Sequence, residues 1–428
     1  MLQTLRLERF KNFQAAELHL GMLTLLIGTN ASGKSNLRDA FRFLHGIGRG
    51  YVLADIIGGK FGEGGERLWT GIRGGANEIT FQGSTTFALE LTFTIAESQT
   101  ARAATYRIEV EPGKNGTLPR VMSEQLAVAG HGDFIFSARA ESPYESRQLK
   151  VETRQPGADQ RRSYPSHQPV ITQLIESQFI QTDRKRIMRA CLDAISSMRF
   201  VDLNPDAMRQ PSFSGQTVLG DRGENLSSVL QSICADEQRK GMLIQWLQAL
   251  TPMDAADFDF PVDQIGRILV TLVEAHGQRT TAYSASDGTL RFLGILATLL
   301  GPEAARFYFL EELENGIHPT RLHVLLQLIE HQVTRQPIQI VATTHSPQLL
   351  RLLSPTTLAH TSLTYRLEGR HAAQIMRILD IPDAQRVLAD QDLARLHESG
   401  WMEDALAFTA ADEDSPATLG GADSEESM

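Results

Sequence analysis

The feature that most constrains this chain is an eight-residue loop between a buried strand and a helix. Residues Gly28–Ser35 have the sequence GTNASGKS, which fits the pattern GxxxxGK[ST] without a mismatch. The apolar run Leu23–Ile27 precedes the loop, and apolar residues at helical spacing follow it. This order is that of a P-loop, which points backbone N–H groups at phosphate oxygens. The sequence therefore predicts an α/β fold that binds a nucleotide.

The loop supplies most of the expected nucleotide contacts. The Lys34 ammonium is expected to reach the β and γ phosphates of ATP, and the Ser35 hydroxyl to ligate Mg²⁺. The N-terminus of the helix that begins there adds a partial positive charge. The other residues predicted to contact the nucleotide are Gly28, Asn30, Ala31, Ser32, Gly33 and Asn36.

A second motif follows an apolar strand in the far half of the chain. Four apolar residues, 307–310, come directly before Glu311 and Glu312. In phosphoryl transfer the first of two such acids holds Mg²⁺ and the second polarises the attacking water. Glu311 stands where Asp is usual. The alternative interpretation is a buried strand that happens to end in surface acids.

Two further segments place polar groups at element ends. His345 follows a predicted strand at 338–343, at the ligand-binding edge of an α/β sheet, where a neutral imidazole can hydrogen-bond a γ-phosphate. Ser286 and Gly288 precede an apolar helix and form a second anion-binding N-terminus. Taken singly, these residues are equally typical of a structural histidine and an ordinary helix cap.

Together these motifs resemble those of the ABC-type ATPases of the RecF, SMC and OLD group, which are classed with the AAA ATP-binding proteins. The matching segments are Leu5–Phe13 (opening strands), Gly28–Ser35 (Walker A), Ser286–Arg291 (signature), Glu311–Glu312 (Walker B), Glu314–Pro319 (D-loop) and His345 (switch histidine).

The resemblance implies a P-loop head that works as a sandwich homodimer. Ser286 and Gly288 of one copy would cap the γ-phosphate held by Lys34 of the other. Hydrolysis by Lys34, Glu312 and His345, with Mg²⁺ on Ser35 and Glu311, would then need two copies. The resemblance also implies a Q-loop glutamine, for which the candidates are Gln82, Gln125 and Gln178.

The spacing of the motifs narrows the subclass. Lys34 and Ser286 are 252 residues apart, but no sustained heptads fill the gap as a long coiled coil would. Only 83 residues follow His345, too few for a fused metal nuclease. The chain therefore resembles a compact RecF-like ATPase, or an OLD-like ATPase that works with a separately encoded effector protein.

Four segments are expected along the chain. Residues 1–135 hold the phosphate loop and an antiparallel β lobe, and residues 136–260 form an insertion or helical subdomain. Residues 261–380 complete the ATPase head with alternating helices and strands, which predict right-handed crossovers in a parallel sheet. Residues 381–428 form a C-terminal extension.

Local patterns give further expectations within these segments. The polar, proline-containing stretch 139–168 is expected to be a long loop or flexible insertion. Helical spacing runs from Ile187 to Met198, and Ile268–Val273 predicts a strand. From about Ala410 the composition predicts a disordered acidic tail.

The net charge of −10 arises mostly at the C-terminal end, where nine acidic residues and no Lys or Arg follow Arg395. The remaining chain is near neutral, so charge neither excludes nor supports a DNA partner. Candidate DNA contacts are Arg184–Arg186 with Arg189 and Arg199, and the segment Arg139–Arg162; solvated helix faces are the alternative.

Two cysteines, Cys191 and Cys234, exclude a disulfide scaffold, and no apolar run is long enough for a membrane span, so a cytoplasmic protein is expected. We hypothesise that ATP-driven closure of a homodimer, or of a higher oligomer, controls DNA or a partner effector in anti-phage defence. The alternatives are a RecF-like DNA-repair ATPase and an ATP-dependent dimerisation switch with little turnover.

Overall fold

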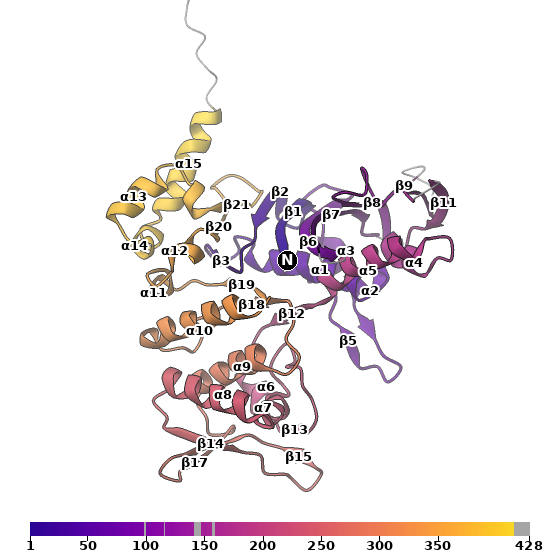
Figure 1. Ribbon diagram of the computed structural model, residues 1–428. Coiled ribbons are helices and arrows are strands. Elements are labelled where there is room, and N and C mark those ends of the chain that lie inside the picture. The colour runs from indigo at the N-terminus through magenta and orange to yellow at the C-terminus, as the bar shows by residue number, and fades with distance from the viewer. Residues whose placement is uncertain (98–99, 115, 141–146, 156–158, 415–428) are drawn as a thin grey trace, which may run out of the picture.

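The computed structural model describes residues 1–97, 100–114, 116–140, 147–155 and 159–414. It is an α/β fold built on two large sheets, as predicted. Figure 1 shows the antiparallel sheet on one side, the second sheet in the middle, a mainly helical lobe below it and the C-terminal helices above.

Eight strands form the antiparallel sheet, in the order β11-β10-β9-β8-β7-β6-β1-β2. They form because apolar side chains alternate with polar ones, so that one face packs inward. In β6, for example, Phe87, Leu89 and Leu91 are fully buried. The strands are β1 (Leu2–Phe10), β2 (Phe13–His19), β6 (Phe87–Glu97), β7 (Thr100–Glu111), β8 (Arg120–Val128), β9 (Phe136–Ala140), β10 (Gln148–Thr153) and β11 (Gln160–Pro165).

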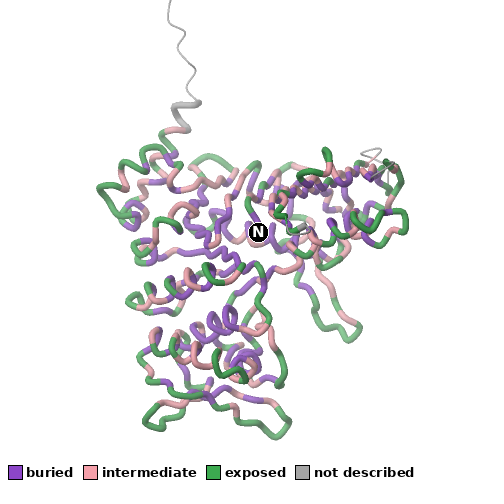
Figure 2. The backbone as a smooth tube through the Cα atoms, in the orientation of Figure 1, coloured by how far each residue is buried: buried purple, intermediate pink, exposed green. Residues whose placement is uncertain are grey.

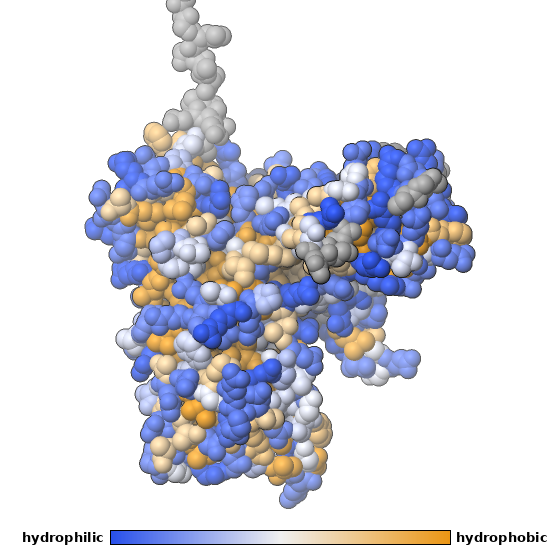
Figure 3. Space-filling model, in the orientation of Figure 1, coloured by the Kyte–Doolittle hydropathy of each residue, from blue (hydrophilic) through white to orange (hydrophobic). Residues whose placement is uncertain are grey.

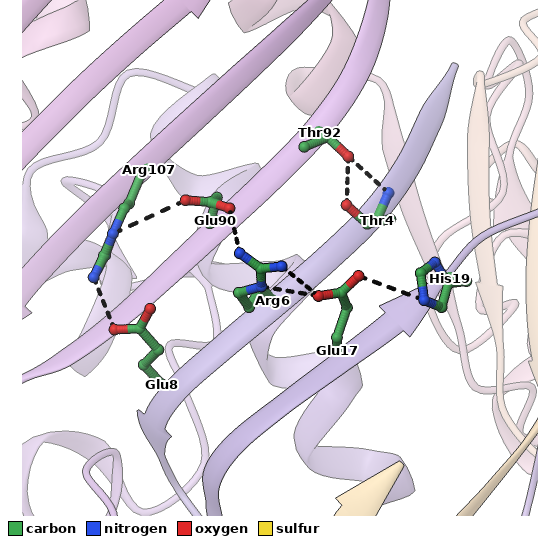
Figure 4. Close-up of polar contacts among 8 residues, drawn as sticks. All are labelled: Thr4, Arg6, Glu8, Glu17, His19, Glu90, Thr92 and Arg107. Carbon is green, nitrogen blue, oxygen red and sulfur yellow. Dashed lines mark hydrogen bonds and ion pairs between the residues drawn. The ribbon is translucent and has the colours of Figure 1, made fainter. Parts of the chain in front are cut away.

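Ion pairs on the opposite face of this sheet link neighbouring strands or reach across one strand (Figure 4). Arg6 lies between two carboxylates, 2.7 Å from Glu17 on β2 and 3.3 Å from Glu90 on β6. Arg107 on β7 lies 2.8 Å from Glu8 on β1. Exposed pairs of this kind contribute about 0–1 kcal/mol each, so they favour the strand register more than they stabilise the fold.

The prediction of a loop at 139–168 is wrong, because the described residues of this segment form β10, β11 and the end of β9. In β10, Leu149 and Val151 are buried while Lys150 between them is exposed. The edge strand β11 buries none of its residues, which explains its polar, loop-like sequence. Residues 141–146 and 156–158 lie outside the described part, and the division into four segments stays a prediction.

The second sheet has the order β12-β18-β19-β3-β20-β21, and all neighbours run parallel except β20 and β21. The predicted parallel sheet is thus confirmed. Met198, however, lies in a strand and not in a helix. The strands are β3 (Leu23–Ile27), β12 (Met198–Val201), β18 (Phe307–Leu310), β19 (Gln339–Thr343), β20 (Thr361–Tyr365) and β21 (Gln374–Arg377).

Short strands complete the β structure. The strand expected at Ile268–Val273 is divided, because its two halves pair with different partners. The short strands are β4 (Lys60–Phe61), β5 (Arg67–Trp69), β13 (Ser212–Phe213), β14 (Ala255–Asp259), β15 (Arg267–Ile268), β16 (Thr271–Glu274) and β17 (Arg279–Thr281).

Helices cover both faces of the second sheet. Those of the head and lower lobe are α1 (Lys34–Gly48), α2 (Leu53–Gly58), α3 (Gly75–Glu78), α4 (Val170–Glu176), α5 (Thr182–Ser196), α6 (Pro205–Met208), α7 (Leu226–Cys234), α8 (Glu237–Leu250), α9 (Asp287–Leu300), η1 (Pro319–Arg321) and α10 (Leu322–Arg335). Those nearer the C-terminus are α11 (Pro347–Leu350), α12 (Pro355–Leu358), η2 (Ile378–Asp380), α13 (Ala384–Asp390), α14 (Leu393–Glu398) and α15 (Trp401–Asp414).

Helix α1 packs between the two sheets and joins their cores. Its Phe41 ring lies 4.8 Å from Phe307 and 6.1 Å from Phe309, measured between ring centroids. The alternate residues of β18, Tyr308 and Leu310, belong to a second core with α7–α10. Figure 2 shows this buried backbone running through the middle of the molecule. Strand β18 is therefore buried on both faces, as its continuous apolar run predicts.

A third core cluster attaches the C-terminal helices to the end of β3. Ile27 packs with Leu350, Leu393 and Met402. Figure 3 shows a largely hydrophilic surface with apolar residues gathered over this region. Helix α15 extends to Asp414, beyond the expected start of the disordered tail, and residues 415–428 lie outside the described part.

No helix in the described part of the chain is long and apolar enough to cross a membrane.

Candidate nucleotide-binding site

Three neighbouring strands end at one edge of the second sheet, and the predicted site residues follow them. Gly28 comes after β3, His345 after β19, and Glu311 after β18. The three strands are parallel and adjacent, so their carboxyl ends meet at the same edge, where α/β sheets bind ligands.

The phosphate loop has the backbone shape that its glycines permit. Gly28 has φ 139°, and a Cβ placed there would lie 2.1 Å from the carbonyl oxygen of Thr364 on β20. Gly33 begins helix α1 with no side-chain cap, which leaves the first N–H groups of the helix facing the loop. Asn30 and Ala31 are exposed at the loop tip. The loop therefore forms a backbone cradle suited to phosphate.

The Lys34 side chain lies against the backbone of the phosphate loop. Its Nζ donates to the carbonyl oxygens of Gly28 (2.5 Å) and Thr29 (2.9 Å), and the residue is 7% exposed. Burial lowers the pKa of Lys34 to about 8, although the carboxylates of Glu312 and Glu314 oppose that shift. A partly desolvated ammonium group gains strongly from an anionic ligand.

Polar side chains from distant segments hold the loop in place. Ser32 Oγ lies 2.7 Å from Thr364 Oγ1, and the Asn36 side chain donates to Asn12 Oδ1 at 2.7 Å. Asn12 Nδ2 in turn donates to the Ser32 carbonyl oxygen at 3.4 Å. Sequence reasoning missed Asn12 and Thr364. Only the resemblance of the opening strands pointed to the first of them.

Ser35 and Glu311, the two predicted metal ligands, lie together. The Ser35 side chain lies beside the Glu311 carboxylate, where it favours the charged form and opposes the rise in its pKa. Arg38 Nη1 lies 3.0 Å from Glu311 Oε2. Burial raises the pKa of Glu311, while Arg38 opposes that rise. Hydroxyl and carboxylate oxygens are the ligands that Mg²⁺ prefers in phosphate sites, so the donor set fits this ion.

Glu312 occupies a constrained position after β18. Its φ is 49°, an uncommon backbone shape for a residue with a side chain. Thr343 Oγ1 accepts from its backbone N–H at 2.9 Å, and the Asn315 amide donates to its carboxylate. Both partners, which sequence reasoning missed, aim an exposed carboxylate whose charge acts on Lys34.

His345 connects the phosphate loop with the segment after Glu312. Its ring lies near the Gly28 carbonyl, and its backbone N–H donates to Glu314 Oε1 at 2.6 Å. Burial, with the nearby Lys34 charge, lowers the pKa of His345, so the imidazole is neutral at pH 7. Glu314, not predicted as a site residue, thus fixes the histidine backbone.

The structure does not bring Ser286 and Gly288 to the cradle. Ser286 caps α9 by accepting from the Thr289 N–H at 3.1 Å. A Cβ on Gly288 would lie 2.3 Å from the carbonyl oxygen of Gly316, in the loop after Glu312. Within the described residues, neither makes a hydrogen bond to the phosphate loop of its own chain.

The Q-loop glutamine stays unassigned. Gln125 lines a 510 Å³ cavity on the antiparallel sheet, and Gln178 lines a 780 Å³ cavity beside β11. Neither cavity includes a residue of the phosphate loop. No contact of Gln82 distinguishes it within the described ranges.

Comparison with known proteins yields one family. A family model described as "AAA domain, putative AbiEii toxin, Type IV TA system" matches residues 23–351, which include every predicted site residue. No curated protein matches the chain.

Among solved structures, the chain is similar to an SMC head domain from Thermotoga maritima, at 12% identity and a TM-score of 0.41, covering 88% of this chain and 98% of that one. It is also similar to an SMC head bound to the C-winged helix domain of ScpA, at 11% identity and a TM-score of 0.48, covering 88% and 97%. A third is an SMC head with an extended coiled coil bound to the C-terminal domain of ScpA derived from Pyrococcus furiosus, at 11% identity and a TM-score of 0.48, covering 91% and 98%.

Proposed function

We propose that this chain, which belongs to the AAA_21 family of AAA domains, is a cytoplasmic ATPase that binds ATP with Mg²⁺, hydrolyses it and dimerises in the ATP-bound state. One observation carries the proposal: Lys34, Glu312 and His345 converge beside a backbone cradle from three adjacent strand ends. Phosphoryl transfer requires mainly such positioning and charge stabilisation from a protein.

Each of the three residues has surroundings that support one role. The partly desolvated Lys34 would bind the β and γ phosphates at the N-terminus of α1. Glu312, oriented by Asn315, would polarise the attacking water. His345, neutral at pH 7, would hydrogen-bond the γ-phosphate without adding a charge.

The remaining contacts come from the loop and from the metal ligands. Ser35 and Glu311 would hold Mg²⁺, which neutralises charge on the phosphates when it is bound. The residues whose backbone and polar groups would surround the phosphates are Gly28, Asn30, Ala31, Ser32, Gly33, Lys34, Ser35 and Asn36.

The signature residues support a homodimer. Ser286 and Gly288 form a capped helix N-terminus that packs on the Gly316 loop and leaves the cradle of its own chain uncapped. A second copy would supply the missing cap, placing Ser286 and Gly288 over the γ-phosphate. The same pairing could extend to a higher oligomer.

Binding and mass measurements test this proposal. Lys34→Ala should abolish binding of a fluorescent ATP analogue, whereas Lys185→Ala, in the first turn of helix α5 and outside the phosphate loop, should not. Glu312→Gln should bind MgATP and accumulate as a dimer in light scattering, because hydrolysis no longer releases it. Retained ATP binding by Lys34→Ala would overturn the proposal.

A matched pair of serines tests the dimer separately. Ser286→Ala and Ser354→Ala each remove a helix N-cap, a loss of about 1 kcal/mol. Only Ser286→Ala should also prevent the ATP-dependent dimer. Equal dimer formation by the two variants would exclude the proposed cap.

We further propose that the dimer acts on DNA or on a partner effector, in anti-phage defence. The family description names a toxin of a toxin–antitoxin system, which supports a separate partner protein. Two cavities of 510 and 630 Å³ share Arg139 on the antiparallel sheet, and the larger also contains Lys150 and Arg162, which supports a phosphate-contacting surface. The cluster on α5 is less available, because Arg184 contacts His131 at 2.7 Å and Arg186 lies 3.5 Å from Asp183.

Salt-dependent DNA binding tests the DNA interaction. Filter binding with ATP present should weaken as salt rises, and Arg139→Ala with Arg162→Ala should reduce both affinity and salt slope. No salt-dependent binding would leave the protein effector as the partner. A RecF-like repair role is the alternative. Measuring whether the protein improves cell survival under phage challenge or after DNA damage separates the two roles.

An ATP-dependent switch with little turnover is the second candidate, favoured by the Glu311–Arg38 ion pair at the metal site. ATP hydrolysis by the wild type, compared with Glu312→Gln, decides between the two, because a switch has little activity to lose.

A further inference from the structure

The carboxylate predicted to hold magnesium already has a cationic partner. Arg38 Nη1 lies 3.0 Å from Glu311 Oε2, and the two side chains are only 14% and 16% exposed. Arg38 lies on α1 one turn after Ser35, whose side chain acts on the same carboxylate. Charges withdrawn from water are screened little by salt, so this guanidinium acts strongly on any third ion near Glu311.

At this place the described residues offer a metal ion the Ser35 hydroxyl and the Glu311 carboxylate, with the Asp202 carboxylate near enough for its charge to act on Glu311. The described residues contain no group of three or more His, Cys, Asp or Glu that could hold a metal ion by themselves. Mg²⁺ requires octahedral oxygen ligands and gives up its water reluctantly. A divalent cation that approached Glu311 without a nucleotide would meet a carboxylate whose charge Arg38 already balances.

On the basis of the proposed function, we propose that Arg38 is a resident counter-ion that makes metal binding at Glu311 depend on the nucleotide. The triphosphate of ATP supplies the metal ion with the negative charge and the oxygen ligands that the protein itself does not provide. The metal therefore enters with ATP and not ahead of it. Arg38 is a positioning residue that acts through Glu311.

The test measures metal binding to the whole chain without nucleotide. Mn²⁺ replaces Mg²⁺, and the electron paramagnetic resonance signal of free Mn²⁺ reports binding. Arg38→Met keeps the apolar stem but removes the charge. It should bind Mn²⁺ at least about tenfold more tightly than the wild type, because the carboxylate is released from its counter-ion. Equal or weaker Mn²⁺ binding by Arg38→Met would overturn the proposal.

Matched variants separate this effect from others. Arg42, one turn further on α1, is 10% exposed in its side chain and pairs with Asp221 at 3.3 Å, so Arg42→Met removes a similar cation that does not touch Glu311. It should leave Mn²⁺ affinity unchanged. Adding Glu311→Gln to Arg38→Met should abolish the gained affinity, and its persistence would place the new site elsewhere and refute the assignment.

Three further measurements complete the test. If Arg38→Met does not fold, as judged by circular dichroism, Arg38→Gln repeats it with a polar but uncharged head. Arg38→Lys, which keeps the charge, should retain the weak Mn²⁺ binding of the wild type. Binding of the fluorescent ATP analogue to the wild type with Mg²⁺ tests the proposed function itself, so loss of that binding is distinguishable from an unchanged Mn²⁺ affinity in Arg38→Met.

Discussion

Replacing Gln339 by leucine should destabilise the protein, because the Gln339 side chain joins the two sheets through hydrogen bonds. Gln339, at the start of β19, accepts from the Leu2 N–H at 2.6 Å and donates to the carbonyl oxygens of Leu2 (2.9 Å) and Gly21 (3.0 Å). One buried amide thus continues the hydrogen bonding of β1 into the second sheet.

The size of the effect follows from these three bonds. Leucine leaves the buried Leu2 N–H without its acceptor and two carbonyls without this donor, at about 1–3 kcal/mol for each group left unsatisfied. The added apolar surface returns about 1.5–3 kcal/mol. For three groups the loss is about 3–9 kcal/mol, so we expect Gln339→Leu to lower the free energy of unfolding by about 1.5–6 kcal/mol, which reaches the range of a severe substitution.

Urea unfolding followed by circular dichroism measures this change, and the chain offers a matched control. Gln332 on α10 is as buried as Gln339, both 4% exposed, but among the described residues its side chain makes one hydrogen bond, accepting from the Gln336 amide at 3.3 Å. Gln332→Leu should therefore change stability by less than about 1 kcal/mol. Unfolding midpoints that coincide for the two variants would refute the role given to the Gln339 amide.

Three other predictions concern the loop, the acid and the antiparallel sheet. Gly28→Ala should lose ATP binding, because its Cβ would lie 2.1 Å from the Thr364 oxygen at φ 139°; unchanged affinity in the fluorescent assay would contradict this. Thr343→Val removes the acceptor of the Glu312 N–H, so turnover should fall about tenfold while ATP affinity stays constant; a change in affinity alone would argue against it. Burial raises the pKa of Glu124 to about 7, so the folded state favours its protonated form. That contribution to stability is complete below pH 4.5 and is lost as pH rises through 7, by about 3 kcal/mol at most; urea unfolding at pH 5 and 8 should show a slope that Glu124→Gln removes.

Contiguous segments with strong periodicity could be predicted from the sequence. Strand β18 has the predicted bounds 307–310 because each of its residues is buried, so no polar position interrupts the run. Helix α9 begins at Asp287, directly after the predicted capping serine, Ser286, whose hydroxyl satisfies a helix N–H whatever lies around it. Both signals are local, and tertiary contacts do not override them.

Short strands that depend on distant partners could not be predicted. Strand β12 has four residues, and Met198 continues the helical spacing of α5, but parallel pairing with β18, more than a hundred residues later, makes it a strand. Strand β11 is polar throughout and forms because β10 provides hydrogen bonds.

The side-chain contacts of the site also could not be predicted from the sequence. The predicted acids and histidine were identified by type, but the Glu314 contact with the His345 backbone joins residues 31 positions apart. The pair of Arg38 and Glu311 joins residues much further apart, and no local pattern links them.

The contact between Gly288 and Gly316 has a consequence for timing in the proposed dimer. With no side chain between them, the start of α9 cannot shift without displacing the loop that carries Asn315, and Asn315 holds the Glu312 carboxylate. When one copy's serine engages the nucleotide of its twin, the shift would reach that copy's own acid. The two nucleotide sites of the dimer would then hydrolyse ATP together. A dimer with a single competent site would hydrolyse ATP slowly at both sites.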